Sequence, residues 1–359
     1  MPTIRDVARA CGLSAATVSY VLNDSRAVRP QTRERVLRAV RSLDYHPSAV
    51  ARGLSRKRMD TIGVVFPATR ESASPITSSY YAPVLDGILE VARRERQNVT
   101  LFQTGPRDGA RERLSAYRDG RCDGLLFVGV AEGDEVVDAL AATDLPLVIV
   151  GSHGSDARPC RVDVDNEAAA RAMTRYLLDL GHRRIGLVSL APLHGAYIPL
   201  RIEGWRAALS DAGVAPCPGP LYVEPSEDSV RDALEGFLAA PAERRPTALF
   251  CLRDVEAVRV LRVLAERDLC VPGDVTVVGF DDRADAALSS PPLTTIRQPL
   301  REKGAAATCL LLDCIAGKAV AGQEYLLSTE LVVRASSGPP PDVARFPFAV
   351  PYPDPLKEA

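Results

Sequence analysis

The sequence of 359 residues contains no apolar run close to the ~18 residues that a membrane-spanning helix needs. Its opening residues, MPTIRDVARA, are charged and lack the apolar segment and cleavage site of a secretory signal. The eight cysteines include no Cys-x-x-Cys pair, which favours reduced thiols over a disulfide framework or a zinc site. We therefore expect a cytoplasmic protein that does not contact a membrane and holds no metal or other cofactor.

Signatures of common enzyme classes are also missing. The chain contains no G-x-S-x-G, no phosphate-binding P-loop, no G-x-G-x-x-G and no H-E-x-x-H, and its four histidines are scattered. We expect no enzymatic activity. The composition, 46% hydrophobic and 25% charged residues, is typical of a globular protein, and the length predicts two or three cores.

Charge is distributed unevenly along the chain. Residues 1–58 carry 12 Arg and Lys against 4 Asp and Glu, a net charge of +8, and the remaining residues carry −10. A basic head on an acidic body is typical of a nucleic-acid-binding module joined to another domain. A basic terminus that is merely solvated is the alternative.

The basic head has the pattern of three short helices. Thr3 and Asp6 form a capping-box-like start before one apolar stripe, Gly12 supplies a turn, and Ser14 can cap a second helix. A third helix is expected from Pro30 to Asp44. Two short helices joined by a glycine turn and braced by a third predict a helix-turn-helix unit. The apolar positions expected to face inward are Ile4, Val7, Ala8, Cys11, Val18, Val21, Leu22, Val36, Leu37, Val40 and Leu43.

The other side of the second helix carries small and polar side chains. Small residues at the leading end, Ala15 and Ala16, let a helix approach base edges, where alanine can contact a thymine methyl group. The Tyr20 hydroxyl can reach a base or a phosphate. Packing of the alanines against the first helix is the alternative. The side chains expected to hydrogen-bond phosphates are Thr17, Ser19 and Asn23.

A short basic segment follows, with the sequence YHPSAVARGLSRKRMDTIGVV. Val50 and Leu54 fall on one face of a helix that Pro47–Ser48 can start, but Gly53 weakens it and two turns are marginal alone. This pattern favours folding on DNA, with Leu54 inserted between base steps in the minor groove. An ordinary linker is the alternative.

Residues 3–62 resemble the lactose/galactose/purine repressor (LacI/GalR) family of bacterial transcription regulators. The resemblance is carried by TIRDVARACGLSAATVSYVLNDS, TRERVLRAVRSLDYHPSAVARGL and TIGVV. It implies that Ala15, Ala16 and Tyr20 read bases and that Leu54 inserts at the operator centre. Tyr20 stands where many members have Arg, Gln or His, which leaves the operator sequence open. The other residues of the expected DNA-contacting set are Thr3, Ser14, Thr17, Ser19, Asn23, Arg26, Ala51 and Ser55.

From Thr61 onward, strand-like apolar runs alternate with helical patterns. Helices are expected at Ala82–Gln97, Glu167–Leu180 and Val255–Arg267. Apolar strands separated by helices predict parallel sheets covered on both faces, and two such doubly wound units fit the remaining length. The expected strands are residues 62–66, 99–103, 124–129, 147–151, 184–190, 248–252 and 275–280.

The family resemblance continues through this body to about Ser337, in blocks such as YLLDLGHRRIGLV, RIEGWRAAL, VTVVGFDD and PPLTTIRQP. It implies two α/β lobes similar to a periplasmic sugar-binding protein. It also implies that Arg201 and Asp281 contact an effector between the lobes. A surface arginine on a helix is the alternative for Arg201.

Three further effector contacts are weaker inferences from the same resemblance. Ser79, Tyr80 and Tyr81 align with the start of a helix that lines the cleft, where an aromatic ring could stack on the effector or simply pack. Arg253 departs from the family pattern, which has Asn there. If Arg253 faces the cleft, an anionic ligand such as a sugar phosphate or acid is favoured; if it pairs with Asp281 or Asp254, it says nothing about the ligand.

These observations predict a helix-turn-helix domain at 1–46, a hinge helix or linker at 47–58 and a two-lobed effector-binding and dimerisation domain at 59–337. Lobe 1 is expected at 59–162 and 293–325, lobe 2 at 163–292 and 326–337, and a Pro-rich disordered tail at 338–359. The predicted function is a homodimeric transcriptional repressor that binds a near-palindromic DNA operator under control of a small-molecule effector, a sugar or sugar derivative. An activator of the same architecture and a non-regulatory sugar-binding protein are the alternatives.

Overall fold

The computed structural model divides into two units. One comprises residues 1–61 with 120–123, here called the head, and the other comprises residues 62–119 with 124–359, here called the body. The structure describes residues 2–22, 28–46, 58–67, 75–104, 109–130, 133–151, 159–190, 195–216, 220–224, 226–239, 241, 244–320 and 322–341.

The head contains the three predicted helices, α1 (Ile4–Cys11), α2 (Ala15–Leu22) and α3 (Pro30–Ser42). Gly12 ends α1 in the left-handed conformation, with φ of 59°, which glycine adopts without strain. The prediction for Leu37 was wrong: its side chain is 39% exposed, and Ala39 faces the core instead. The reason is the helix phase, because Val36 and Ala39 lie three residues apart on the buried face. The fully buried core residues are Val7, Ala8, Cys11, Val18, Val21, Val36 and Ala39.

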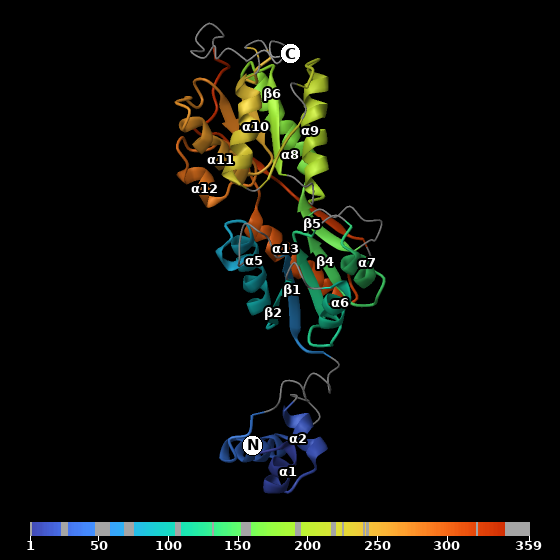
Figure 1. The fold of residues 1–359 in the computed structure, drawn as a ribbon. Helices are drawn as coiled ribbons and strands as arrows, with labels where there is room; N and C mark the ends of the chain where they lie inside the picture. The colour runs from blue at the N-terminus through green and yellow to red at the C-terminus, as the bar shows by residue number, and fades with distance from the viewer. Residues whose placement is uncertain are drawn as a thin grey trace. The chain divides into compact units, whose positions relative to one another are not determined.

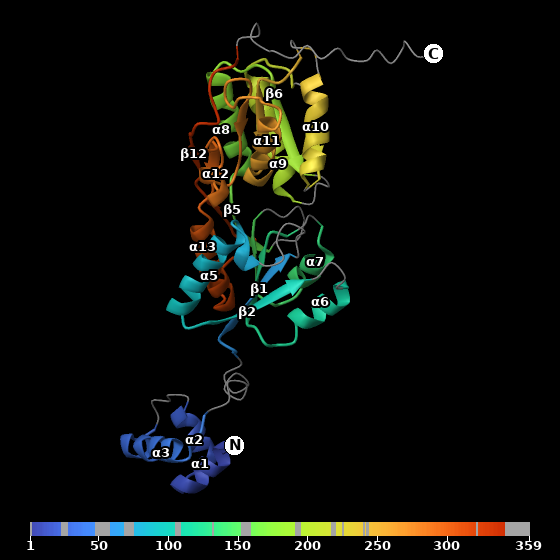
Figure 2. The same cartoon turned by 60° about the vertical axis from the view of Figure 1, so that its left-hand side comes forward.

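The first lobe of the body is built on a six-stranded sheet of order β11-β5-β4-β3-β1-β2. Its recorded strand pairs are parallel, as continuous apolar strands predict. Helices α5 (Tyr81–Arg94) and α13 (Leu300–Ile315) cover one face, and α6 (Ala110–Tyr117) and α7 (Glu135–Ala141) cover the other (Figures 1 and 2). The strands are β1 (Thr61–Pro67), β2 (Asn98–Thr104), β3 (Gly124–Val128), β4 (Leu147–Val150), β5 (Cys160–Val164) and β11 (Glu324–Leu327).

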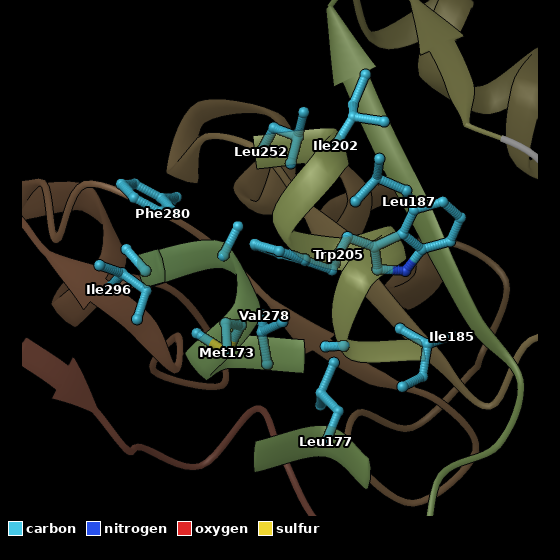
Figure 3. Packing of buried hydrophobic residues seen from close by; sticks show 14 of the residues in the cluster. Met173, Leu177, Ile185, Leu187, Ile202, Trp205, Leu252, Val278, Phe280 and Ile296 are labelled. Atoms are coloured by element: carbon cyan, nitrogen blue, oxygen red, sulfur yellow. The ribbon is translucent and has the colours of Figure 1, made fainter. Parts of the chain in front are cut away.

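The second lobe has a four-stranded parallel sheet of order β7-β6-β8-β9. Helices α8 and α9 pack together, as do α10 and α11. Figure 3 shows Trp205 of α9 among apolar side chains that include Met173, Leu187 and Val278. The elements are β6 (Ile185–Leu190), β7 (Leu221–Val223), β8 (Ala248–Cys251), β9 (Thr276–Val278), α8 (Asn166–Asp179), α9 (Tyr197–Asp211), α10 (Glu227–Ala239), α11 (Asp254–Ala265) and α12 (Ala284–Leu288).

Three crossover segments connect the lobes. The first joins β5 to α8, the second joins β10 (Thr295–Arg297) to α13, and the third joins β11 to β12 (Glu330–Val332). The second crossover lies at residues 298–299 and not at 293, because bridges from Val278 to Thr294 and from Asp281 to Arg297 attach β10 to lobe 2. The third lies at 328–329 and not at 326, because β11 continues to Leu327 in the lobe 1 sheet.

Candidate DNA-binding face and effector site

Ser14 caps the N-terminus of α2, as its position after the turn predicts. Its Oγ accepts a hydrogen bond from the Thr17 backbone N–H at 3.1 Å and lies 2.8 Å from the Thr17 hydroxyl. At the preceding helix, the Asp6 carboxylate accepts hydrogen bonds from both the N–H (2.9 Å) and the hydroxyl (2.7 Å) of Thr3. These bonds lower the pKa of Asp6. Thr3, Ser14 and Thr17 therefore already have local structural roles.

The outward side of α2 carries two of the predicted base-reading residues. Ala16 is exposed, and so is Tyr20, at 60%, one helical turn further on. Ser19 is half-buried, and Ala15 packs partly against the head core, which is the alternative considered for the alanines. The predicted contacts outside the described residues are Asn23, Arg26, Ala51, Leu54 and Ser55.

In the body, Arg201 is buried on α9, with 3% of its surface exposed, which excludes a surface position. Its Nε donates a hydrogen bond to Asn166 at 2.9 Å, and its Nη1 donates one to the Leu252 carbonyl. Its Nη2 lies 3.7 Å from a carboxylate oxygen of Asp281. The guanidinium carbon lies 3.4 Å from the ring centre of Phe280, at a distance suited to cation–π attraction.

The ion pair of Arg201 and Asp281 belongs to a closed circuit of buried polar contacts, whose other links are hydrogen bonds. Asp281 accepts from the Gln298 amide at 2.7 Å, and Lys303 donates to Gln298 at 2.8 Å and to Asp163 at 2.6 Å. Asn166 then donates to Asp163 at 3.0 Å and closes the circuit. We call these six side chains the polar ring: Asp163, Asn166, Arg201, Asp281, Gln298 and Lys303.

The polar ring connects two crossover segments. Asp163 and Asn166 flank the first, whereas Gln298 lies in the second and Lys303 follows it in α13. All six side chains are buried, so their hydrogen bonds replace those that water would make. The ring therefore joins the residues expected to contact the effector to two of the segments that connect the lobes.

The charges of the ring perturb each other. Burial raises the pKa of Asp281, although Arg201, Arg283 and Arg253 oppose the shift. Burial lowers the pKa of Lys303, but Asp163 and other neighbours more than offset this, and the net shift is upward. Asp281 also has a φ of 124°, a strained conformation for a residue with a side chain. Its backbone is held by hydrogen bonds to Ile296 and Gln298.

Arg253 pairs with an acid that the sequence did not suggest. Its Nε and Nη2 donate to the two carboxylate oxygens of Glu256 at 2.9 and 2.6 Å. Pairing with Asp281 or Asp254 was one of two alternatives, and the structure has Glu256 as the partner because it lies three residues away in the first turn of α11, within reach of the guanidinium fork. Arg253 therefore gives no argument for an anionic ligand.

The three lobe 1 candidates differ in their surroundings. Ser79 accepts a hydrogen bond at 2.7 Å from the Nε of Arg283, a lobe 2 residue. Burial raises the pKa of Tyr80, and its electrostatic neighbours include Lys303 and Asp281, which places Tyr80 beside the polar ring. Tyr81 packs edge-on against Phe66 and Tyr80, in agreement with the packing alternative.

Sequence reasoning missed several residues that the structure brings to this junction. A lysine on the buried side of α13 and the polar residues at the end of β5 could have been noticed as polar groups in apolar surroundings. Their hydrogen-bond partners come from segments far away in the sequence, so the sequence alone could not predict which residues pair. The missed residues are Asp163, Asn166, Arg283, Gln298 and Lys303.

The described residues contain neither a metal-binding cluster nor a membrane-spanning helix. No cluster of three or more His, Cys, Asp or Glu side chains there could hold a metal ion. No helix in the same part of the chain has the length and apolar character needed to cross a membrane.

Comparisons with known proteins agree with this arrangement. Residues 3–48 match the model of bacterial regulatory proteins of the lacI family, and residues 174–337 match a periplasmic binding protein-like domain. The HTH-type transcriptional repressor PurR of Vibrio campbellii is 32% identical, over 93% of this chain and 98% of its own length. The ribose operon repressor of Haemophilus influenzae is 31% identical, over 94% and 98%.

Among solved structures, a lac repressor dimer bound to operator and the anti-inducer ONPF has a TM-score of 0.79 at 28% identity. The match covers 94% of this chain and 99% of the lac repressor chain. A helix-turn-helix head joined to a two-lobed body of the periplasmic-binding type defines a class of ligand-controlled transcription regulators. The chain belongs to the LacI family of that class. It is a DNA-binding transcriptional regulator with an effector-binding body.

Proposed function

We propose that this protein is a cytoplasmic transcriptional repressor that binds a near-palindromic operator as a homodimer. A small-molecule effector, a sugar or sugar derivative, controls its operator affinity from a site at the junction of the lobes. The observation that carries this proposal is the polar ring, in which Arg201 and Asp281 share one circuit of buried polar contacts with residues at two crossovers. Relatives named as repressors support repression, as opposed to activation, of transcription.

Exposed apolar residues on the body support the homodimer. Leu89 on α5, Leu101 on β2 and Leu288 on α12 are 44%, 43% and 83% exposed. Helices α5 and α12 lie on the same side of the body in Figures 1 and 2, and we propose this side as the dimer face. Large apolar side chains left exposed on a surface can be covered by a partner. A two-fold dimer would present two heads and would explain a palindromic operator.

The polar ring suggests how an effector acts. Arg201 and Asp281 already form an ion pair with each other and hydrogen bonds to neighbours, so a ligand that bonds to either one replaces a contact of the ring. Such a replacement changes the hydrogen bonds of Asn166 and Gln298, which lie at the crossovers. Effector binding then stabilises one arrangement of the two lobes relative to each other. Because this arrangement is thermodynamically coupled to DNA binding, the operator affinity changes.

The DNA-binding part can be tested with the purified full-length chain and a library of random duplexes. We expect enrichment of one near-palindromic sequence, which becomes the operator for all later measurements. Leu54→Ala is expected to weaken operator binding at matched salt, since the side chain is proposed to insert between base steps. Equal operator affinity of the variant and the parent would contradict the role of Leu54, and failure to enrich any sequence would contradict the function.

A further inference from the structure

Arg283 lies at the junction of the lobes, immediately before α12. Its Nε donates to the hydroxyl of Ser79 in lobe 1 at 2.7 Å, and its backbone N–H donates to Asp254 at 2.8 Å. Both Arg283 and Ser79 are half-buried. Arg283 is also one of the charges acting on Asp281, so its guanidinium lies beside the polar ring.

Three other cations at this junction have a carboxylate partner. Arg201 lies against Asp281, Lys303 bonds to Asp163, and Arg253 forms a two-pronged pair with Glu256. Arg283 differs from them. Within the described part of the chain, its guanidinium makes the hydrogen bond to Ser79 and no ion pair.

Two acids lie beside Arg283, namely Asp281, on whose charge it acts, and Asp254, which accepts from its backbone N–H, but neither forms an ion pair with its guanidinium in the described part of the chain. Asp281 is engaged by Gln298 and Arg201, and burial raises its pKa. Asp254 is occupied by the Thr295 hydroxyl (2.6 Å) and the Arg283 backbone N–H, and burial raises its pKa to about 7. Burial therefore favours the neutral form of Asp254.

An arginine is a costly choice if its only task is to bond a serine hydroxyl. Partly withdrawing a charge from water without bonding it to an opposite charge is unfavourable, and a neutral amide could donate the same hydrogen bond. The arrangement becomes favourable when a ligand supplies the negative charge. The Nε bond to Ser79 also fixes the guanidinium plane, which leaves the two terminal NH₂ groups to form the parallel pair of bonds that a carboxylate or phosphate accepts.

We infer that the effector carries an anionic group, a carboxylate or a phosphate, and that Arg283 binds it between the lobes. The Ser79 hydroxyl, which accepts from Arg283, keeps its own hydrogen to donate to the same anion. This inference rests on the proposed effector site and makes Arg283, on the lobe 2 side, its specificity-determining residue. Because Ser79 precedes α5 and Arg283 precedes α12, an anion held there links the two helices of the proposed dimer face.

The test uses full-length protein and three kinds of probe: inorganic phosphate, uncharged sugars, and the phosphate esters and acids of the same sugars. We expect phosphate and at least one sugar phosphate or sugar acid to raise the melting temperature of the parent protein, since a ligand that binds only the folded state stabilises it. The uncharged form of that sugar should bind at least 10-fold more weakly. Separate arms for esters and acids distinguish a phosphate from a carboxylate.

The variants are Arg283→Met and Arg283→Lys, with Arg206→Met as the matched control because Arg206 is exposed on α9 of the same lobe. Arg283→Met should weaken binding of the anionic probe at least 10-fold by calorimetry and leave binding of the uncharged sugar unchanged. Arg283→Lys should retain part of the affinity, because a lysine keeps the charge without the fork. Melting curves without ligand establish that each variant is folded.

Several outcomes would overturn the inference. If uncharged sugars bind as tightly as their acids and esters, or if Arg283→Met leaves anion binding intact, the effector is not selected by charge and the proposed function stands. An equal loss in Arg206→Met would show only general attraction of anions. If no probe stabilises the protein although it still selects an operator, the effector site fails together with this inference, and the DNA-binding function remains.

Discussion

The head and the body arrange their functional residues in different ways. In the head, Ala16 and Tyr20 come from one helix of eight residues and point outward from a core to which they contribute little. In the body, the polar ring comes from four separated parts of the chain and is buried throughout. The residues proposed for recognition are therefore separate from the core in the head, whereas in the body the residues proposed to bind the effector also make the buried polar contacts that support the fold. Substitutions can test this contrast.

The largest effect is expected from Lys303→Met. The substitution leaves Asp163 buried without its cation, and breaking a buried ion pair by removing one partner costs about 3–5 kcal/mol. Urea unfolding followed by the fluorescence of Trp205, the only tryptophan, measures the loss in the body.

The matched control is the double variant Lys303→Met with Asp163→Leu, which removes both charges. We expect it to recover much of the lost free energy of unfolding, because an apolar pair can replace a buried ion pair at little cost. A single variant as stable as the parent would show that the ring does not support the fold.

The next effect concerns pH and Asp254. Its pKa in the folded protein, about 7, lies above its ordinary value of 3.8, so the folded state binds the proton more tightly. The contribution of Asp254 to stability is complete below pH 4 and is lost as the pH rises to about 7, by up to about 4 kcal/mol. Urea unfolding at several pH values should show this fall.

Asp254→Asn provides the comparison for the pH experiment. Asparagine cannot ionise, so the fall in the free energy of unfolding between pH 4 and 7 should become smaller. Part of it should remain, because burial also raises the pKa of Asp281. An identical pH dependence in parent and variant would refute the assignment to Asp254.

In the head, Tyr20→Ala should affect binding and not stability. The side chain is 60% exposed, and loss of one base contact weakens operator binding by about 1–3 kcal/mol, or roughly 5- to 150-fold. Fluorescence anisotropy with the selected operator measures this, and the melting temperature should stay constant. Leu37→Ala, which removes an exposed apolar side chain from α3, serves as the control. If the melting temperature falls with the affinity, the separation proposed for the head is wrong.

The smallest effect is expected from Ser14→Ala. The change removes the hydroxyl that accepts from the Thr17 N–H, and loss of such a cap costs about 1 kcal/mol of helix stability. Hydrogen exchange should show roughly 5-fold faster exchange at the Thr17 amide, and the body amides should not change. Unchanged protection at Thr17 would mean that another group caps α2.

The same contrast explains what the sequence could predict. The three head helices and seven body strands follow from local periodicity, because each element buries its own apolar face. Short strands such as β7, β10 and β12 were missed since three residues carry too little pattern. Leu37 was misplaced for a similar reason, because its helix has two adjacent apolar positions and only the fold selects Val36.

The effector site was only partly predictable. Arg201 and Asp281 were identified through the family resemblance, and both prove to be buried at the junction. The partner of Arg253 could not be chosen among nearby acids, since the choice depends on side-chain reach in the first turn of α11. Lys303 and Asp163 lie 140 residues apart, and their pairing follows from the way α13 packs against β5.

The most direct test of the account is an operator-binding isotherm measured with and without a ligand that raises the melting temperature of the body. We predict that the ligand changes the affinity for the selected operator at least 10-fold and leaves binding to random duplex unchanged. If the full-length protein binds the operator with the same affinity in both conditions, the proposed coupling between the polar ring and DNA binding is wrong.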